Sequence, residues 1–346
     1  MKKGMLFLIL LGVLAAIVGC KPSQPAELVL MTHDSFDIGE ATIAAFEEKH
    51  AVKVTILKAG DAGEALNKAI LSKGNPLADL FFGVDNTFLS RALQEGLFEP
   101  YRSPELANID PALQLDPKHR LLPVDWGDVC LNYDKAWFAQ AGITPPTALE
   151  DLIKPEYKGL TVVENPATSS PGLAFLLTTV AHFGPTGYLD YWSKLRDNDV
   201  WVESGWSEAY YGQFSAAGDG NRPIVVSYAT SPAAEVYYSE GAYSEPPTAA
   251  VLTPGTCFRQ IEFVGILKGS KQVKLARAFV DWMLSRTFQE DIPLHMWVFP
   301  ANKQATLPPV FAEWAAQAQA PATLSPDDIA ANRENWINAW TETVLR

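Results

Sequence analysis

Between residues 28 and 95 the chain alternates short apolar segments with segments of helical periodicity. The apolar segments are 28–31, 52–57 and 77–84, and the helical ones are 38–48, 61–72 and 86–95. Apolar residues repeated every three or four positions predict amphipathic helices, whereas short apolar or alternating runs predict strands. Because right-handed crossovers join successive strands in a β-α-β-α-β-α order, the pattern predicts a parallel sheet with helices on both faces.

Polar residues follow the three predicted strands. His33 and Asp34 come after the first strand, Asp61 and Ala62 after the second, and Asp85 after the third. In open α/β sheets, ligands bind outside the carboxyl ends of the strands. We therefore expect these five residues at a ligand site, where the carboxylates could face a cation.

A second α/β set between residues 135 and 252 repeats the first in kind, and two extended segments connect the sets. The run 121–133 leads out of the first set, and 258–267 is the return strand. A chain of 346 residues with 48% hydrophobic content is long enough for two domains. We expect an α/β fold of two lobes joined by two hinge strands, with 28–125 and 258–346 in lobe 1 and 126–257 in lobe 2.

The first 27 residues are not expected to belong to either lobe. Two lysines precede an apolar run, 5–18, that has the length of a signal-peptide core and is too short to span a bilayer. The run ends in Ile17-Val18-Gly19-Cys20, which resembles the lipobox of bacterial lipoproteins. We expect 1–19 to be a signal peptide, Cys20 to carry lipid, and 20–27 to tether an extracytoplasmic protein to the membrane. An ordinary cleavage site with an incidental Cys is the alternative.

Cys130 and Cys257 remain as a pair once Cys20 is assigned to lipid. In an exported protein, such a pair predicts a disulfide, here between the outgoing and returning segments, although two buried free thiols are the alternative. The sequence has neither a CxxC nor an HExxH motif, so we expect no metal site and no cofactor. A formal net charge of −13 argues against a nucleic-acid partner, which requires a basic surface.

The segment 165–172 (NPATSSPG) precedes an apolar run and predicts the start of a helix. Ser170 suits the N-cap and Pro171 the first helical position. The free amide groups of such a terminus, with the hydroxyls of Ser169 and Ser170, could hold an oxygen of a ligand. An ordinary capped helix is the alternative, but the segment follows the first strand of lobe 2 and should therefore face the cleft.

Three aromatic stretches also fall in loops that should line the cleft. The ligand-facing residues expected there are Trp206, Tyr228, Ala229, Thr230, Ser231 and Trp297. Aromatic faces stack on flat rings and attract cations, and nearby carboxylates add to that attraction. The sequence thus predicts a site for a flat cationic ligand, with packing in the core as the alternative for each ring.

Two hinged lobes with an export signal and a lipid anchor describe the substrate-binding protein of an ATP-driven importer, whose lobes close on the ligand. The chain resembles one family of this kind, the thiamine-binding proteins of bacterial thiamine ABC importers. The resemblance is carried by MTHDSF (31–36), ADLFFGVDN (78–86), NPATSSPGL (165–173), GWSEAY (205–210), SYATSPA (227–233) and the Trp-x-x-Pro at Trp297. Members often have Tyr at position 33, Gly at 62 and Tyr at 234, where this chain has His, Ala and Ala.

The resemblance implies a type II periplasmic-binding-protein fold and binding of thiamine, often with its mono- and diphosphate. The ligand contacts that it implies are Asp61, Ala62, Ser169, Ser170, Trp206, Tyr228, Ala229, Thr230, Ser231 and Trp297. We expect a monomer that is not an enzyme, is lipid-anchored or periplasmic, and delivers its ligand to a membrane permease.

Two other functions fit parts of the pattern. Thiaminase I is similar in fold to these binding proteins and uses a nucleophilic Cys. Cys130 would have that role only as a free thiolate with a base beside it. Alternatively, the ligand is a polyamine, another organic cation or a ferric complex, and iron would favour clustered Tyr and His side chains.

Overall fold

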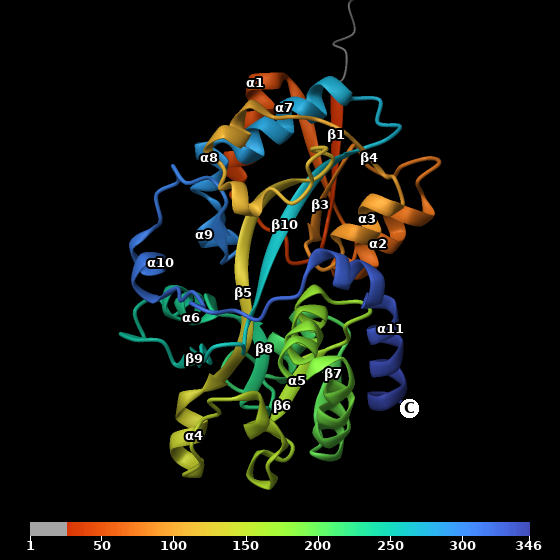
Figure 1. Cartoon of the computed structure of the whole chain (residues 1–346). Coiled ribbons are helices and arrows are strands. Elements are labelled where there is room, and N and C mark those ends of the chain that lie inside the picture. Colours follow the sequence, from red (N-terminus) through yellow and green to blue (C-terminus); the bar gives the residue numbers. More distant parts are fainter. Residues whose placement is uncertain (1–25) are drawn as a thin grey trace, which may run out of the picture.

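A computed structural model of the chain describes residues 26–346 (Figure 1). The expected signal peptide, the expected lipid attachment at Cys20 and most of the expected tether lie outside these residues. Ala26 and Glu27, which were expected in the tether, are the first residues of a strand. No helix between Ala26 and Arg346 combines the length and the apolar character that a membrane span requires.

The elements of the first predicted set are all present, with their ends shifted by up to three residues. The strands are β1 (Ala26–Thr32), β2 (Val52–Lys58), β3 (Leu80–Asp85), β4 (Phe98–Glu99), β5 (Leu122–Asp134), β6 (Thr161–Glu164), β7 (Trp201–Glu203), β8 (Ile224–Tyr228), β9 (Thr248–Ala250), β10 (Phe258–Leu267) and β11 (Phe299–Pro300). The α-helices are α1 (Glu40–His50), α2 (Ala62–Leu71), α3 (Leu89–Gln94), α4 (Lys135–Ala141), α5 (Ser170–Asp197), α6 (Ser231–Tyr238), α7 (Val273–Leu284), α8 (Arg286–Gln289), α9 (Ile292–His295), α10 (Pro309–Trp314) and α11 (Pro326–Val344). Short 3₁₀ turns lie at Pro104–Asn108, Pro111–Leu113, Leu149–Ile153 and Pro155–Tyr157, and a π-helical turn lies at Glu208–Gln213.

The main strands form one continuous sheet in the order β2-β1-β3-β10-β5-β8-β6-β7. β1 pairs in parallel with β2 and β3, and β6 pairs in parallel with β7 and β8, as expected for two α/β sets. We refer to β1–β3 with their helices as the first half of the molecule, and to β6–β8 with theirs as the second half. Figure 1 shows the first half at the top and the second half at the bottom.

β5 and β10 run antiparallel through the middle of the sheet and connect the two halves (Figure 1). β10 pairs with β3 of the first half, and β5 pairs with β8 of the second half. These strands are the predicted outgoing and returning segments. Cys130 of β5 and Cys257, directly before β10, form the predicted disulfide, which excludes the alternative of two free thiols. The lobe boundaries themselves stay a prediction.

α5 begins one residue earlier than predicted and consists of two helices separated by a kink. Ser169 is the N-cap and has extended backbone angles, whereas Ser170 is already helical, so the prediction of Ser170 as the cap was wrong. Gly184 leaves the helical region with a φ of 77°, and Pro185, which has no N–H to continue the ladder, follows it. The first of the two helices is buried over most of its length, which fixes its N-terminus beside the end of β6.

The C-terminal helix α11 contacts both halves of the molecule. Its large apolar side chains are buried. Trp340 meets Trp192 of α5 edge to face, with the ring centroids 5.5 Å apart. On the other side, the guanidinium of Arg333 lies 5.2 Å from the centre of the Phe88 ring, directly before α3. The helix therefore packs against α5 of the second half and against the first half at α3.

Candidate functional site

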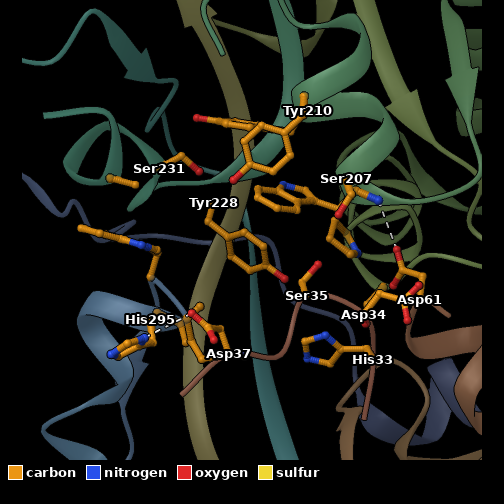
Figure 2. Close-up of a pocket in the computed structure, with 18 of the residues that line it drawn as sticks. His33, Asp34, Ser35, Asp37, Asp61, Ser207, Tyr210, Tyr228, Ser231 and His295 are labelled. Carbon is orange, nitrogen blue, oxygen red and sulfur yellow. Dashed lines mark hydrogen bonds and ion pairs between the residues drawn. The ribbon is translucent and has the colours of Figure 1, made fainter. Parts of the chain in front are cut away.

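A cavity of about 610 Å³ lies between the two halves, beside the loops that follow β1 and β2. The predicted ligand-facing residues that line it are His33, Asp34, Asp61, Ala62, Ser170, Trp206, Tyr228, Ser231 and Trp297. Figure 2 shows His33, Asp34 and Asp61 on one side, with Tyr210 and Tyr228 facing them. The remaining predicted residues, Asp85, Ser169, Ala229 and Thr230, are buried and are not part of the wall.

The residues behind the wall are engaged by their own surroundings. Asp85 is fully buried and accepts a hydrogen bond from the N–H of Thr87 at 2.6 Å. Burial raises the pKa of Asp85 to about 7. Thr230 donates its hydroxyl to the carbonyl oxygen of Trp297. The side chains of Asp85 and Thr230 therefore stabilise the loops beside the cavity through hydrogen bonds to the main chain.

His33 and Glu262 form a close pair at one end of the cavity. Nε2 of His33 lies 3.1 Å from Oε1 of Glu262. Gly83 makes room for the imidazole, because its φ is +102° and a Cβ there would lie 2.4 Å from Cδ2 of His33. Burial alone would lower the pKa of His33, but the charge of Glu262, with those of Asp61 and Asp34, raises it.

Asp61 joins the two halves across the edge of the cavity. One of its oxygens accepts from the N–H of Ala62 at the start of α2 (2.6 Å), and the other accepts from the N–H of Trp206 in the second half (3.2 Å). Beside it, the N–H of Gly63 donates to the carbonyl of Thr168 (3.0 Å). Burial raises the pKa of the Asp61 carboxyl group. The halves are thus in direct contact at this edge.

Trp206 and Tyr210 form an aromatic stack in the wall of the second half. Their ring centroids lie 4.9 Å apart, and the ring planes are inclined by 20°. The indole N–H of Trp206 donates to Oγ of Ser227 (2.9 Å), and the hydroxyl of Tyr210 donates to Oε1 of Glu235 (2.7 Å). These hydrogen bonds fix both rings in place.

Trp297 occupies a backbone conformation that is unusual for a residue with a side chain. Its φ of +56° lies in the left-handed region, and such strain persists only where the surroundings enforce it. The hydroxyl of Thr230 donates to the Trp297 carbonyl, and the Trp297 indole N–H donates to the hydroxyl of Tyr238 (3.2 Å). Both partners come from the second half, so Trp297, which follows β10 in the chain, is tied to that half.

Tyr228, at the end of β8, lies against the two connecting strands. Its hydroxyl donates to Oε1 of Gln260 in β10 (3.3 Å). Gly127 of β5 leaves space for the ring, because a Cβ at that position would lie 2.9 Å from Cδ1 of Tyr228. The close approach of the Tyr228 ring therefore requires glycine at position 127.

Several residues of the wall were not predicted as ligand-facing. They include Asp37, Tyr211, Glu235, Tyr238, Gln260 and Glu262, whereas Ser35, Tyr210 and His295 lie in segments that were predicted to line the cleft but were not named as ligand contacts. Gln260 and Glu262 alternate along the predicted return strand, so their period-two spacing was a signal that both lie on one face. Tyr210 ends an aromatic stretch, 205–210, that was predicted to line the cleft. Tyr238 carried no comparable signal, because the orientation of its short helix depends on tertiary packing.

Carboxylates outnumber potential cations in the cavity wall. Its acidic side chains are Asp34, Asp37, Asp61, Glu235 and Glu262, its imidazoles are His33 and His295, and it contains no Lys or Arg. A flat, positively charged ligand suits this wall, because it would offset the carboxylate charge and stack on the rings. Among residues 26–346, no group of three or more His, Cys, Asp or Glu side chains is placed to hold a metal ion.

The fold and the cavity between its halves are those of a solute-binding protein. Residues 75–322 match the family of bacterial extracellular solute-binding proteins, and the chain belongs to this family. A thiamine-binding periplasmic protein of Salmonella typhimurium is 32% identical over 324 residues, which cover 92% of this chain and 94% of the relative. The protein of the same name from Escherichia coli is 31% identical with the same coverage.

A solved structure gives the same relationship in three dimensions. It is a periplasmic thiamin binding protein that matches this chain with a TM-score of 0.82 at 29% sequence identity, covering 92% of this chain and 96% of that chain. The predicted type II periplasmic-binding-protein fold and the predicted solute-binding role are thereby confirmed.

Proposed function

We propose that this protein captures thiamine in the cavity between its halves and delivers it to the membrane permease of an ABC importer. The observation that carries the proposal is the cavity wall, which combines aromatic rings with carboxylates and contains no Lys or Arg. Thiamine has a flat pyrimidine ring and a positively charged thiazolium ring, and both suit this wall. The names of the relatives from Salmonella and Escherichia support the same ligand.

Each part of thiamine has a partner of suitable chemistry. The rings that would stack on it are Trp206, Tyr228 and Trp297. Asp34 and Asp61 would offset its positive charge. Oγ of Ser170 is buried at the N-terminus of α5 and has no hydrogen-bond partner in the protein, so it would bind the hydroxyethyl or phosphate end. Asp85, Ser169, Ala229 and Thr230 would support these groups from behind the wall.

Capture would require the two halves to move as lobes about β5 and β10. The contacts of Asp61 with Trp206 and of Trp297 with Thr230 would form on closure and break on release. We further propose that the protein acts as a monomer and is held at the membrane by lipid on Cys20. The periplasmic relatives support an extracytoplasmic location.

The rival functions have less support. Cys130 is bonded to Cys257, is buried and lies outside the cavity wall, so it offers no free thiolate for a thiaminase-like attack. Tyr210 and Tyr211 line the cavity, but no metal-holding group of His, Cys, Asp or Glu accompanies them in the described part of the chain. A ferric complex is therefore disfavoured, and a polyamine or another organic cation is the main competitor.

Calorimetric titration with thiamine tests the proposal. We expect binding at micromolar protein concentration, and the absence of any heat of binding there would contradict the proposal. Spermidine and ferric citrate, titrated in parallel, test the other ligands. Tighter binding of either one than of thiamine would overturn the assignment.

Trp297→Ala tests the stacking role. The change should lower the affinity for thiamine by about 1 to 3 kcal/mol, with base stacking on aromatic side chains as the guide. Trp201→Ala is a matched control, because Trp201 is 46% exposed and lies outside the cavity wall. An equal loss in both variants would argue against stacking at Trp297.

A further inference from the structure

Three carboxylic acids lie side by side across the centre of the sheet. Glu262 of β10 is in register with Asp85 of β3 on one side and with Asp125 of β5 on the other. The three residues are 5%, 0% and 1% exposed, respectively. Buried carboxylates this close to one another cannot all be ionised without a large cost in free energy.

Glu262 is the member of this row that lines the cavity. Its Oε1 lies at ion-pair distance, 3.1 Å, from Nε2 of His33. Nε2 of His33, both carboxyl oxygens of Asp125 and one of Asp85 have no hydrogen-bond partner within the described residues. Burial raises the pKa of Asp85 to about 7, and burial together with the charge of Glu262 raises the pKa of Asp125 well above its ordinary value. Of the three carboxyl groups, only that of Glu262 lies at the cavity surface, where it can face a ligand.

His33 is shared between Glu262 and two further carboxyl groups. The imidazole lies near Asp34 and Asp61 as well as Glu262, so one potential cation serves three carboxylates. Two positions earlier on β10, Gln260 holds Tyr228 through its hydroxyl. Neighbouring positions on one face of the strand thus present a carboxylate and an aromatic ring to the same ligand.

We propose that Glu262 is the residue that selects for the positive charge of the ligand, an inference that rests on the function proposed above. A cationic ring beside this carboxylate regains by ion pairing what it loses in hydration. A neutral ring of the same shape would keep the same contact area but would leave Glu262 with His33 alone. Specificity for the cation is then a difference in affinity between two ligands that have the same contact area.

Calorimetry with two ligands tests this inference. The ligands are thiamine and its uncharged thiophene analogue, in which carbon replaces the quaternary nitrogen. The wild-type protein should prefer thiamine by about 30-fold or more, the lower end of the range expected when a buried charge loses its partner. In Glu262→Gln the preference should fall below about 3-fold, because the shape is kept and the charge is removed.

Glu150→Gln is the matched control. Glu150 also pairs with an imidazole, since its Oε1 lies 2.8 Å from Nε2 of His182, but the pair lies outside the cavity wall. This variant should keep the wild-type preference. Thermal unfolding of each variant verifies that it is folded. If Glu262→Gln does not fold, Glu262→Asp, which keeps the charge but withdraws it from the cavity, should still reduce the preference.

The outcomes separate this inference from the function on which it rests. A wild-type protein that binds thiamine and the neutral analogue equally overturns the role of Glu262 and leaves thiamine binding intact. If the folded Glu262 variants prefer thiamine over the neutral analogue as strongly as the wild type does, the role of Glu262 is likewise overturned and thiamine binding is left intact. A wild-type protein that binds neither ligand overturns the proposed function, and the role of Glu262 with it.

Discussion

The two sides of the cavity differ in the kind of interaction that they offer. The charged side, His33, Asp34, Asp61 and Glu262, comes from the loops of the first half and from β10. The aromatic side, Trp206, Tyr210 and Tyr228, comes from the second half. Trp297 follows β10 in sequence but is hydrogen-bonded to the second half through Thr230 and Tyr238.

This difference suggests a division of roles. Aromatic faces supply contact area for any flat ring, and they add a further attraction for a cationic one. Carboxylates discriminate between ligands by charge, but an ion pair that is open to water contributes little. A ligand that requires both sides is held strongly only when the halves enclose it. The following variants test this comparison.

The largest effect is expected for Asp85→Asn, a change behind the charged side of the cavity. It concerns how the free energy of unfolding depends on pH. The Asp85 carboxyl has a pKa of about 7 in the folded protein against 3.8 as its ordinary value. As pH rises from 4 to 8, the unfolded chain releases this proton before the folded one does, so the wild type loses stability relative to Asp85→Asn. The relative free energy of unfolding should shift by up to about 4 kcal/mol in favour of the variant.

Chemical denaturation of both proteins at several pH values measures this shift. Asp190→Asn is the control, because Asp190 is exposed, and it should show no comparable trend. A difference between wild type and Asp85→Asn that stays constant from pH 4 to pH 8 would contradict the prediction.

Trp206→Ala tests the aromatic side. Loss of the stacked ring should lower affinity by about 1 to 3 kcal/mol, and by a similar factor for thiamine and for its neutral analogue. Titration calorimetry with both ligands measures the two factors. Trp137→Ala, at an indole that packs on Phe138 away from the cavity, is the control. If Trp206→Ala lost affinity for thiamine but not for the neutral analogue, the aromatic side would also discriminate by charge, which would contradict the proposed division of roles.

Asp61→Ala tests the contact between the sides. Asp61 and Asp134 both cap helices: Asp61 accepts from the N–H of Ala62, and Asp134 accepts from the N–H of Trp137 at 3.0 Å. Each alanine variant should therefore lose about 1 kcal/mol of stability. Only Asp61 also accepts from the opposite half, at the N–H of Trp206. Ligand affinity should therefore fall in Asp61→Ala by about 1 kcal/mol and stay unchanged in Asp134→Ala. Equal affinities in the two variants would contradict the bridging role.

The smallest effect is expected for Tyr238→Phe. The change removes the hydroxyl that accepts from the Trp297 indole but keeps the ring, which is 61% exposed. Affinity for thiamine should fall by no more than about 1 kcal/mol, the usual net value of one hydrogen bond. Tyr243→Phe, at an exposed tyrosine outside the cavity wall, is the control. A loss as large as that of Trp297→Ala would mean that this hydrogen bond, and not stacking, positions the indole.

The fold could be predicted from the sequence to the extent that it depends on local periodicity. The alternation between residues 28 and 95 predicted the parallel strands of the first half correctly, because strand and helix periods are local properties. The merging of both halves into one sheet through β5 and β10 could not be derived in detail, because it depends on pairing between distant segments. The cap of α5 was misplaced by one residue, since Ser169 and Ser170 are equally suitable cap residues.

The candidate site was predictable where it depends on strand order. Asp61 follows β2 and lines the cavity, as expected. Asp85 was expected after its strand but is the last residue of β3, where it accepts from the N–H of Thr87 and stays behind the wall. The hydrogen bonds within a loop cannot be derived from strand order alone. Glu262 was missed because the return strand was interpreted as a connection, although its alternation with Gln260 already indicated a shared face.

The position of α11 has a consequence for how the binding site empties. The helix cannot keep both of its contacts if the halves separate. Its contact with the second half is made by two almost fully buried indoles, Trp192 and Trp340, whereas its contact with the first half includes a single guanidinium over the ring of Phe88. If the halves separate, we expect the second contact to break first and α11 to stay with the second half, although its residues were predicted in lobe 1. A chain truncated before Pro326 would lose this restraint and release its ligand faster.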